Sequence, residues 1–376
     1  GETLAGMTTE ASETPTAPAD PLTGRLTDLL LELCGMVCVT GEEGPIADWM
    51  ADRYGSRGDV VVRIGNSVVA GVPEDDGDDR PLVLLVGHLD VVPPTPEDVT
   101  PRIEGDMIVG RGTSDMKAGL AIAMDAFEDE RLRKKGPYRM ALVAYAGEEG
   151  PEEGNELTDV LEAMPGLADA ALAIVLEPTD MEVQLGCMGG LHAEVTFAGQ
   201  AAHSARPWQG DNALTKAGEW LAGWRGATPV DTDVDGLTYR EVANPTRAWT
   251  DNARNVIPGA FTVNVNYRFA PDKDLAAAEA ALRERIGDVG EVVIIDRAPA
   301  CPPNRHAPAV QAFVDAVDGA VTPKQAWTDV ARFAQIGVPA LNYSPGLGAQ
   351  AHQQGEHVPI ANLAPARQAL GRFLAG

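Results

Sequence analysis

The chain has 376 residues with 44% hydrophobic residues, enough for two domains with sizeable cores. Its formal net charge of −27 argues against nucleic acids and anionic membranes as partners, and no apolar run approaches the length of a membrane span. Four scattered cysteines are too few for a disulfide framework, so we expect a cytoplasmic enzyme.

The first 23 residues differ in composition from the rest of the chain. They are rich in Thr, Ala, Pro and Glu, show no periodicity and lack the basic start and apolar centre of a signal peptide, so we predict a disordered tail over 1–23. The residues before Met7 resemble an expression remnant. An alternation of helices and strands follows, typical of α/β architecture. We predict helices over 26–37, 45–55 and 120–135, a hairpin over 60–72, and strands over 81–90, 139–147 and 170–178.

The pattern changes near Gly186. A long period-two strand over 183–203 is followed by a helix, a strand, a helix and a strand, ending at residue 298, a self-contained α+β module. The α/β pattern returns after residue 302. We therefore predict a discontinuous catalytic domain over 24–186 and 302–376, with a mixed sheet flanked by helices. A ferredoxin-like lid or dimerisation domain is inserted over 187–301.

Acidic and imidazole side chains stand at the ends of apolar runs in the predicted catalytic domain. An apolar core rejects unpaired carboxylates, and ligands of open α/β sheets gather at the carboxyl ends of the strands. Taken singly, each residue has an ordinary structural explanation, such as a core histidine, a solvated Glu pair or a capped turn. Together they predict a metal site. The residues are His88, Asp90, Asp115, Glu148, Glu149, Glu177 and His352.

Four signatures occur in a familiar order: GHLDVVP, GTSDMKAG, the Glu pair in AYAGEEG, and a carboxylate in VLEP, with AHQQGEHVP near the end. They resemble the co-catalytic zinc aminoacylase and carboxypeptidase family over essentially the whole chain after the tail. The resemblance implies a zinc-exopeptidase-like fold and two divalent metal ions, most simply zinc, with cobalt or manganese as alternatives. It implies that Asp115 bridges the ions, with His88 and Glu177 on one ion and Glu149 and His352 on the other. Glu148 is then the general base, and Asp90 accepts the second N–H of the His88 imidazole.

The resemblance extends to the inserted domain. His203 in AAHSARPW is similar to a histidine that crosses a dimer to stabilise the oxyanion, so a homodimer is implied. Asn255 and Arg268 match residues that hold a substrate carboxylate. Strings such as GCMGGLHAEV, ARNVIPG and WTDVARF resemble the desuccinylase branch found in high-GC actinobacteria. That branch implies an anionic N-succinyl substrate yielding succinate and diaminopimelate, with Arg206 and Arg332 as further carboxylate contacts.

Two other functions stay open at this stage. One is a different hydrolase of the same family, such as an acetylornithine-type deacetylase, another N-acyl amino acid amidohydrolase, a dipeptidase or a carboxypeptidase. Met188 and Cys187 stand where other desuccinylase branches place basic residues, which keeps this alternative open. The other is a metal-binding protein without catalysis. Glu148 argues against it, because this residue has a chemical role and no structural one.

Overall fold

A mixed eight-stranded sheet carries most of the candidate site in the computed structural model, which describes residues 20–71 and 77–376. The strand order is β1-β2-β6-β3-β7-β17-β8-β16. The central strands β6, β3, β7 and β17 run parallel, while β1, β2 and β8 pair antiparallel with a neighbour. Their bounds are Val61–Ile64 (β1), Ser67–Ala70 (β2), Leu82–His88 (β3), Arg139–Tyr145 (β6), Leu172–Val175 (β7), Val183–Leu185 (β8), Val321–Pro323 (β16) and Ala340–Asn342 (β17). The predicted mixed sheet is confirmed.

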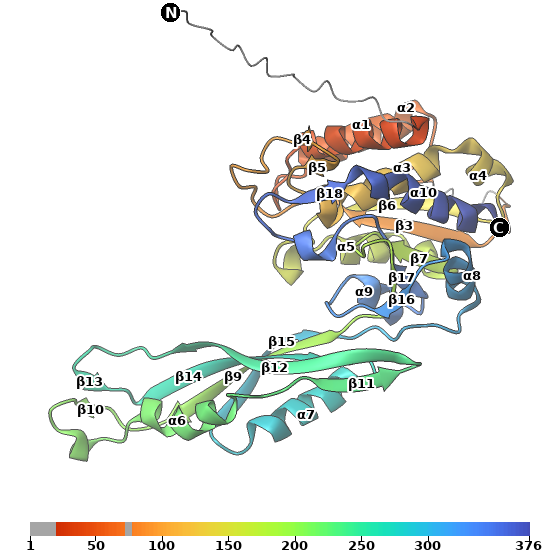
Figure 1. Ribbon diagram of the computed structural model, residues 1–376. Coiled ribbons are helices and arrows are strands. Elements are labelled where there is room, and N and C mark those ends of the chain that lie inside the picture. The colour runs from red at the N-terminus through yellow and green to blue at the C-terminus, as the bar shows by residue number, and fades with distance from the viewer. Residues whose placement is uncertain (1–19, 72–76) are drawn as a thin grey trace, which may run out of the picture.

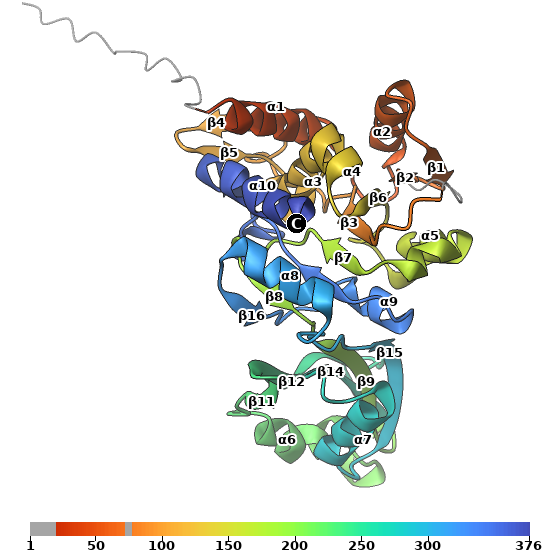
Figure 2. The ribbon, with the colours of Figure 1, turned by 90° about the vertical axis from the view of Figure 1, so that its right-hand side faces the viewer.

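Helices cover both faces of this sheet, as Figures 1 and 2 show. One core lies under α1 (Pro21–Gly35), α2 (Gly44–Ser56), α3 (Ala118–Glu128), α8 (Pro308–Val317) and α10 (Ile360–Ala375). The opposite core lies under α5 (Leu157–Ala163) and α9 (Val330–Gln335). Within the described ranges, no helix has both the length and the hydropathy needed to cross a bilayer.

Four local features differ from the predictions. Helix α1 begins at Pro21, so the predicted tail is too long by three residues; residues 1–19 lie outside the described part. The Asp20 side chain caps this helix by accepting from Leu22 N and Thr23 N. The helix predicted over 120–135 is two helices, α3 and α4 (Glu130–Lys135), because Asp129 leaves helical geometry and caps the second. Residues 183–185 form β8 in the central sheet, so the long strand starts later than predicted. A small sheet of β4 (Arg102–Glu104), β5 (Met107–Val109) and β18 (His357–Pro359) was missed.

A second, five-stranded sheet lies beyond β16 and α9 (Figure 2). Its order is β11-β12-β14-β9-β15, all antiparallel, with α6 and α7 packed on one face. The order without the hairpin strand β11 is that of the ferredoxin-like β-α-β-β-α-β arrangement. The bounds are β9 (Gly189–Ala198), α6 (Ala213–Gly223), β11 (Val230–Val234), β12 (Leu237–Trp249), β14 (Ala260–Phe269), α7 (Leu275–Ile286) and β15 (Glu291–Ala298). We call this part the lid. The chain enters the lid near Cys187 and leaves it near Cys301, and these two residues form an antiparallel β-bridge.

The four cysteines are free and buried, which makes their reactivity predictable. Burial raises the pKa of Cys34 to about 12 and that of Cys187 to about 11, so both stay as neutral thiols at about pH 8. We predict that the native protein, fully reduced beforehand, shows no fast-reacting thiol toward a colorimetric disulfide reagent, whereas the protein unfolded in guanidinium shows four. A native thiol that reacts as fast as the unfolded ones would contradict the buried positions.

Candidate metal centre

Three adjacent parallel strands deliver the predicted site residues to one edge of the central sheet. His88 is the last residue of β3, the Glu148–Glu149 pair follows β6, and Glu177 follows β7. Because β6 and β7 are the two neighbours of β3, their carboxyl ends meet around His88. This is the edge at which ligands of open α/β sheets bind, as the sequence predicted.

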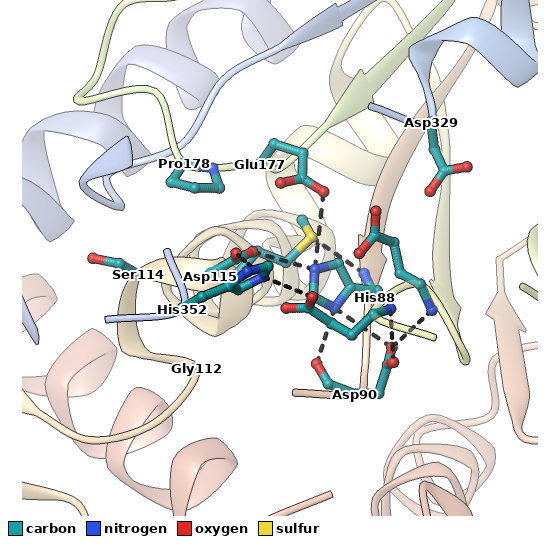
Figure 3. A network of polar contacts seen from close by, with 12 residues as sticks. His88, Asp90, Gly112, Ser114, Asp115, Glu177, Pro178, Asp329 and His352 are labelled. Atoms are coloured by element: carbon teal, nitrogen blue, oxygen red, sulfur yellow. Dashed lines mark hydrogen bonds and ion pairs between the residues drawn. The ribbon is translucent and has the colours of Figure 1, made fainter. Parts of the chain in front are cut away.

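The two carboxylate oxygens of Asp115 face different predicted ligands, and we call these two groups of ligands the half-sites; Figure 3 draws Asp115 with His88, Glu177 and His352. The Oδ1 atom of Asp115 is 3.4 Å from Nε2 of His88, which is also 3.9 Å from Oε1 of Glu177. Its Oδ2 atom is 3.6 Å from Nε2 of His352, which is 2.8 Å from Oε2 of Glu149. The five predicted ligands therefore converge around Asp115, and their division between two ions stays a prediction.

The donor atoms at this centre fit divalent cations. Ligand atoms of His88, Asp115 and Glu149 lie within 4.8 Å of one another, and so do those of His88, Glu148 and Glu177. Nε2 of His88 and Oε1 of Glu177 are buried and have no hydrogen-bond partner among the described residues. Buried polar atoms are rarely left unpaired, so these two atoms point to a missing partner. Imidazole and carboxylate suit zinc, cobalt or manganese.

The electrostatics of the centre also favour a cation. Burial, with nearby carboxylates, raises the pKa of Glu148 well above its ordinary value and raises the pKa of Glu149. Burial and the charge of Asp115 raise the pKa of Glu177 to about 7. For Asp115 itself, the effect of burial is outweighed by the close contact with His88 and its charge, and the pKa falls. The carboxylates therefore repel one another without a cation, and a cation at the centre relieves that repulsion.

Asp90 holds both His88 and the Glu pair, but through different atoms than predicted. Nδ1 of His88 lies 2.9 Å from the backbone carbonyl oxygen of Asp90, whereas the Asp90 carboxylate is 3.6 Å away. The carboxylate instead accepts the backbone N–H groups of Glu148 (3.1 Å) and Glu149 (3.0 Å) and the hydroxyl of Thr40 (2.8 Å). A hydrogen bond donated by Nδ1 leaves the lone pair of His88 Nε2 available for a metal ion, and such a bond fixes the orientation of the ring.

The lid residues do not all come together within one chain. The exposed residues His203, Arg206 and Asn255 gather around β10 (Ala202–His203) and β13 (Val256–Ile257), where Ser204 N donates to Asn255 O at 2.9 Å. Figure 1 places β10 and β13 at the end of the lid remote from β3, β6 and β7. Arg268 lies near the other end of β14, opposite Gly190 of β9. Within a single chain, Asn255 and Arg268 therefore lie at opposite ends of the lid, and their contact with one substrate carboxylate stays a prediction.

Arg332 is engaged by protein groups. Its guanidinium donates to Asp329, to the hydroxyl of Thr158 and to both carboxylate oxygens of Glu152. Asp329 in turn accepts from the hydroxyl of Tyr145 at 2.6 Å. A substrate carboxylate could reach Arg332 only by displacing Glu152, whose side chain is 66% exposed.

Two buried carboxylates near the centre had no role in the sequence-based prediction. Asp329 belongs to the WTDVARF string and Glu356 to AHQQGEHVP. Both are fully buried. Their place within motifs of the predicted site was the signal for them in the sequence, because the partners of Glu356, and all partners of Asp329 named here except Arg332, lie far away along the chain.

The fold and the centre together define a candidate two-metal site at the carboxyl edge of an α/β sheet. Residues 84–376 match the model of Peptidase family M20/M25/M40, and the chain belongs to this family. The predicted family resemblance is confirmed.

Two relatives with high sequence coverage carry the name of one enzyme of this family. A protein of Mycobacterium tuberculosis, provisionally named a succinyl-diaminopimelate desuccinylase, is 36% identical, covering 94% of this chain and 99% of its own. The succinyl-diaminopimelate desuccinylase of Corynebacterium glutamicum is 34% identical, covering 89% and 92%. The predicted resemblance to the actinobacterial desuccinylases is thus confirmed.

Solved structures show the same fold at low sequence identity. The aminopeptidase PepT of Bacillus cereus superimposes with a TM-score of 0.73 at 19% identity, covering 94% of this chain and 98% of its own. A Bacillus subtilis protein described as a dinuclear metal-binding peptidase of the M20 family gives a TM-score of 0.65 at 13% identity, covering 94% and 98%. These likenesses confirm the predicted zinc-exopeptidase-like fold.

The raised pKa of Glu177 predicts that metal binding releases protons. Below about pH 7 this carboxyl is protonated in the metal-free protein, and a divalent cation needs it ionised, so the proton must leave on binding. We predict more protons released per zinc ion at about pH 6 than at about pH 8, with weaker apparent affinity at the lower pH. Calorimetry in buffers of different ionisation enthalpy measures the release. Equal release at both pH values would contradict this assignment.

Proposed function

We propose that the protein hydrolyses an N-acyl amide with two divalent ions, and that its substrate is N-succinyl-LL-2,6-diaminopimelate. The observation that carries the two-metal part is the position of Asp115, whose two oxygens face separate sets of imidazole and carboxylate donors. The names of relatives at 34 and 36% identity over most of the chain support the substrate. We propose zinc as the native metal, since imidazole and carboxylate ligands suit it.

The residues around the centre divide the chemistry among themselves. Two bound divalent ions would polarise the amide carbonyl and lower the pKa of an attacking water. Glu148 is the general base that removes a proton from this water as its oxygen bonds to the carbonyl carbon. Glu148 then donates that proton to the departing amine as the C–N bond breaks. Burial and the neighbouring carboxylates raise the pKa of Glu148, which favours its action as a proton donor in the second step.

The lid supplies groups for an anionic substrate. Arg268 and Arg206 suit the planar carboxylates of the succinyl and diacid parts. Asn255 and His203 lie at the remote end of the lid, so we propose that they reach the metal centre of a partner subunit in a homodimer, where His203 stabilises the oxyanion. We propose that a substrate carboxylate contacts Arg332 of α9 by displacing its exposed partner Glu152.

A substrate panel tests the proposed reaction. With zinc supplied, we expect kcat/KM for N-succinyl-diaminopimelate to exceed that for N-acetylornithine and for simple dipeptides by on the order of a hundredfold, because a site that pairs buried polar groups with the substrate rejects analogues lacking them. Dipeptides belong in the panel because several structural neighbours are peptidases. Preference for a dipeptide or for N-acetylornithine would replace this substrate with the other one.

The Glu148→Gln variant tests the mechanism independently of the substrate. The amide cannot take a proton from water, so we expect kcat to fall by about 10²- to 10⁴-fold. Two metal ions per chain should remain bound, because the five predicted ligands are intact. Metal analysis and initial rates on the best substrate of the panel measure both quantities. Near-full activity of this variant would remove Glu148 from its role.

A mixture of two inactive variants tests whether His203 acts across a dimer. A hybrid of Glu148→Gln and His203→Ala subunits contains one site with an intact base and an intact His203 of the partner subunit. Random mixing should restore about a quarter of the wild-type rate, since half of the dimers carry one such site. Each variant alone serves as the control. Failure to recover activity, although mass spectrometry shows the hybrids, would contradict action across the dimer.

A further inference from the structure

Glu356 is a buried carboxylate that contacts the metal centre only through backbone and arginine groups. It lies four residues after His352 and is fully buried. All four of its side-chain hydrogen bonds come from the turn that carries Asp115. The donors are Ser114 N (2.8 Å) and Asp115 N (2.8 Å) to Oε1, and Gly112 N (2.9 Å) and Arg111 Nη1 (2.9 Å) to Oε2.

These bonds join two parts of the chain that each carry a predicted metal ligand. Asp115 and Glu356 are 241 residues apart in sequence, yet the backbone N–H of Asp115 donates directly to Glu356. The same two segments are tied at three further points: Gly110 N donates to Glu356 O, the hydroxyl of Ser114 donates to His357 O, and β18 pairs with β5. The carboxylate shared by the half-sites and the segment of His352 are therefore held as one unit.

The chemistry of the contacts requires a carboxylate at this position. All four partners are donors, and an ionised carboxylate offers only acceptor sites. A glutamine would turn an NH₂ group toward two of these donors. Arg111 compensates the charge of Glu356 and also forms an ion pair with Asp98, in which Nη2 and Oδ2 are 3.1 Å apart. Burying an ion pair is costly, and a hydrophobic contact would hold the segments at lower cost, so the gain here is a defined position of the turn.

We propose that Glu356 is a positioning residue that sets the spacing between the two metal half-sites by holding the Asp115 turn against the His352 segment. This proposal rests on the two-metal function proposed above. It predicts that loss of the carboxylate weakens metal binding, because outer-shell partners of ligands typically contribute about 10- to 100-fold to metal affinity. Glu356 touches neither substrate nor metal in this role.

The test compares Glu356→Gln with Glu104→Gln, a matched control in β4 of the small sheet with an exposed side chain. Metal affinity is measured by competition with a chromophoric chelator, and geometry by the visible spectrum of the cobalt-substituted protein. We expect affinity to fall by about 10- to 100-fold and the cobalt spectrum to change for Glu356→Gln, with both unchanged for the control. Excess metal should restore much of the lost activity.

A second variant covers the case in which Glu356→Gln does not fold. Glu356→Asp keeps the charge and shortens the side chain by one methylene, so we expect a smaller loss of affinity and a shifted cobalt spectrum. Wild-type affinity and an unchanged spectrum in the folded variant would overturn the role of Glu356. If the wild-type protein itself binds fewer than two ions per chain, the proposed two-metal function fails instead, and this outcome is read directly from the wild-type titration.

Discussion

Mutual repulsion of the carboxylates that meet at the carboxyl end of β3 is the constraint on which the rest of this structure depends. Asp115, Glu149 and Glu177 converge around His88, and burial raises the pKa of two of them. Burying such a cluster without cations lowers the stability of the folded protein. The cluster is therefore better explained by metal binding than by a contribution to stability. The strand order β6-β3-β7 brings these side chains together, because adjacent parallel strands end at the same edge of the sheet.

Three further buried carboxylates lie around this cluster and hold nearby segments in place by accepting hydrogen bonds from them. Asp90 holds the Glu148–Glu149 turn, Glu356 holds the Asp115 turn, and Asp329 receives the hydroxyl of Tyr145 at the end of β6. Each of these carboxylates accepts hydrogen bonds from the protein. None of them therefore competes with the predicted ligands for a cation. The inner residues can therefore repel one another and still keep their positions.

Sequence reasoning recovered the parts of the structure that depend on local pattern. The apolar runs of β3, β6 and β7 predicted the sheet edge with His88, Glu149 and Glu177 after the strands, whereas the assignment of all five ligands, including Asp115 and His352, came from the family resemblance of their motifs. Sequence reasoning failed where the structure depends on local backbone geometry or on contacts between distant residues. The Asp20-Pro21 pair does signal the true start of α1, but the compositional bias of the tail hid it. Three-residue strands such as β4 and β18 carry too little pattern to recognise. The carbonyl oxygen of Asp90, and not its carboxylate, accepts from His88, and the bonds to Glu356 span more than 240 residues, so neither could be predicted from sequence spacing.

The central claim is that Asp115 is shared between two metal ions, and crystallography of the zinc-loaded protein tests it most directly. Anomalous scattering measured on both sides of the zinc edge would locate the ions without reference to the protein coordinates. The account predicts two peaks about 3.5–4 Å apart, one beside each oxygen of Asp115, with His88 and Glu177 on one and Glu149 and His352 on the other. A single peak, or two peaks that do not share Asp115, would contradict it.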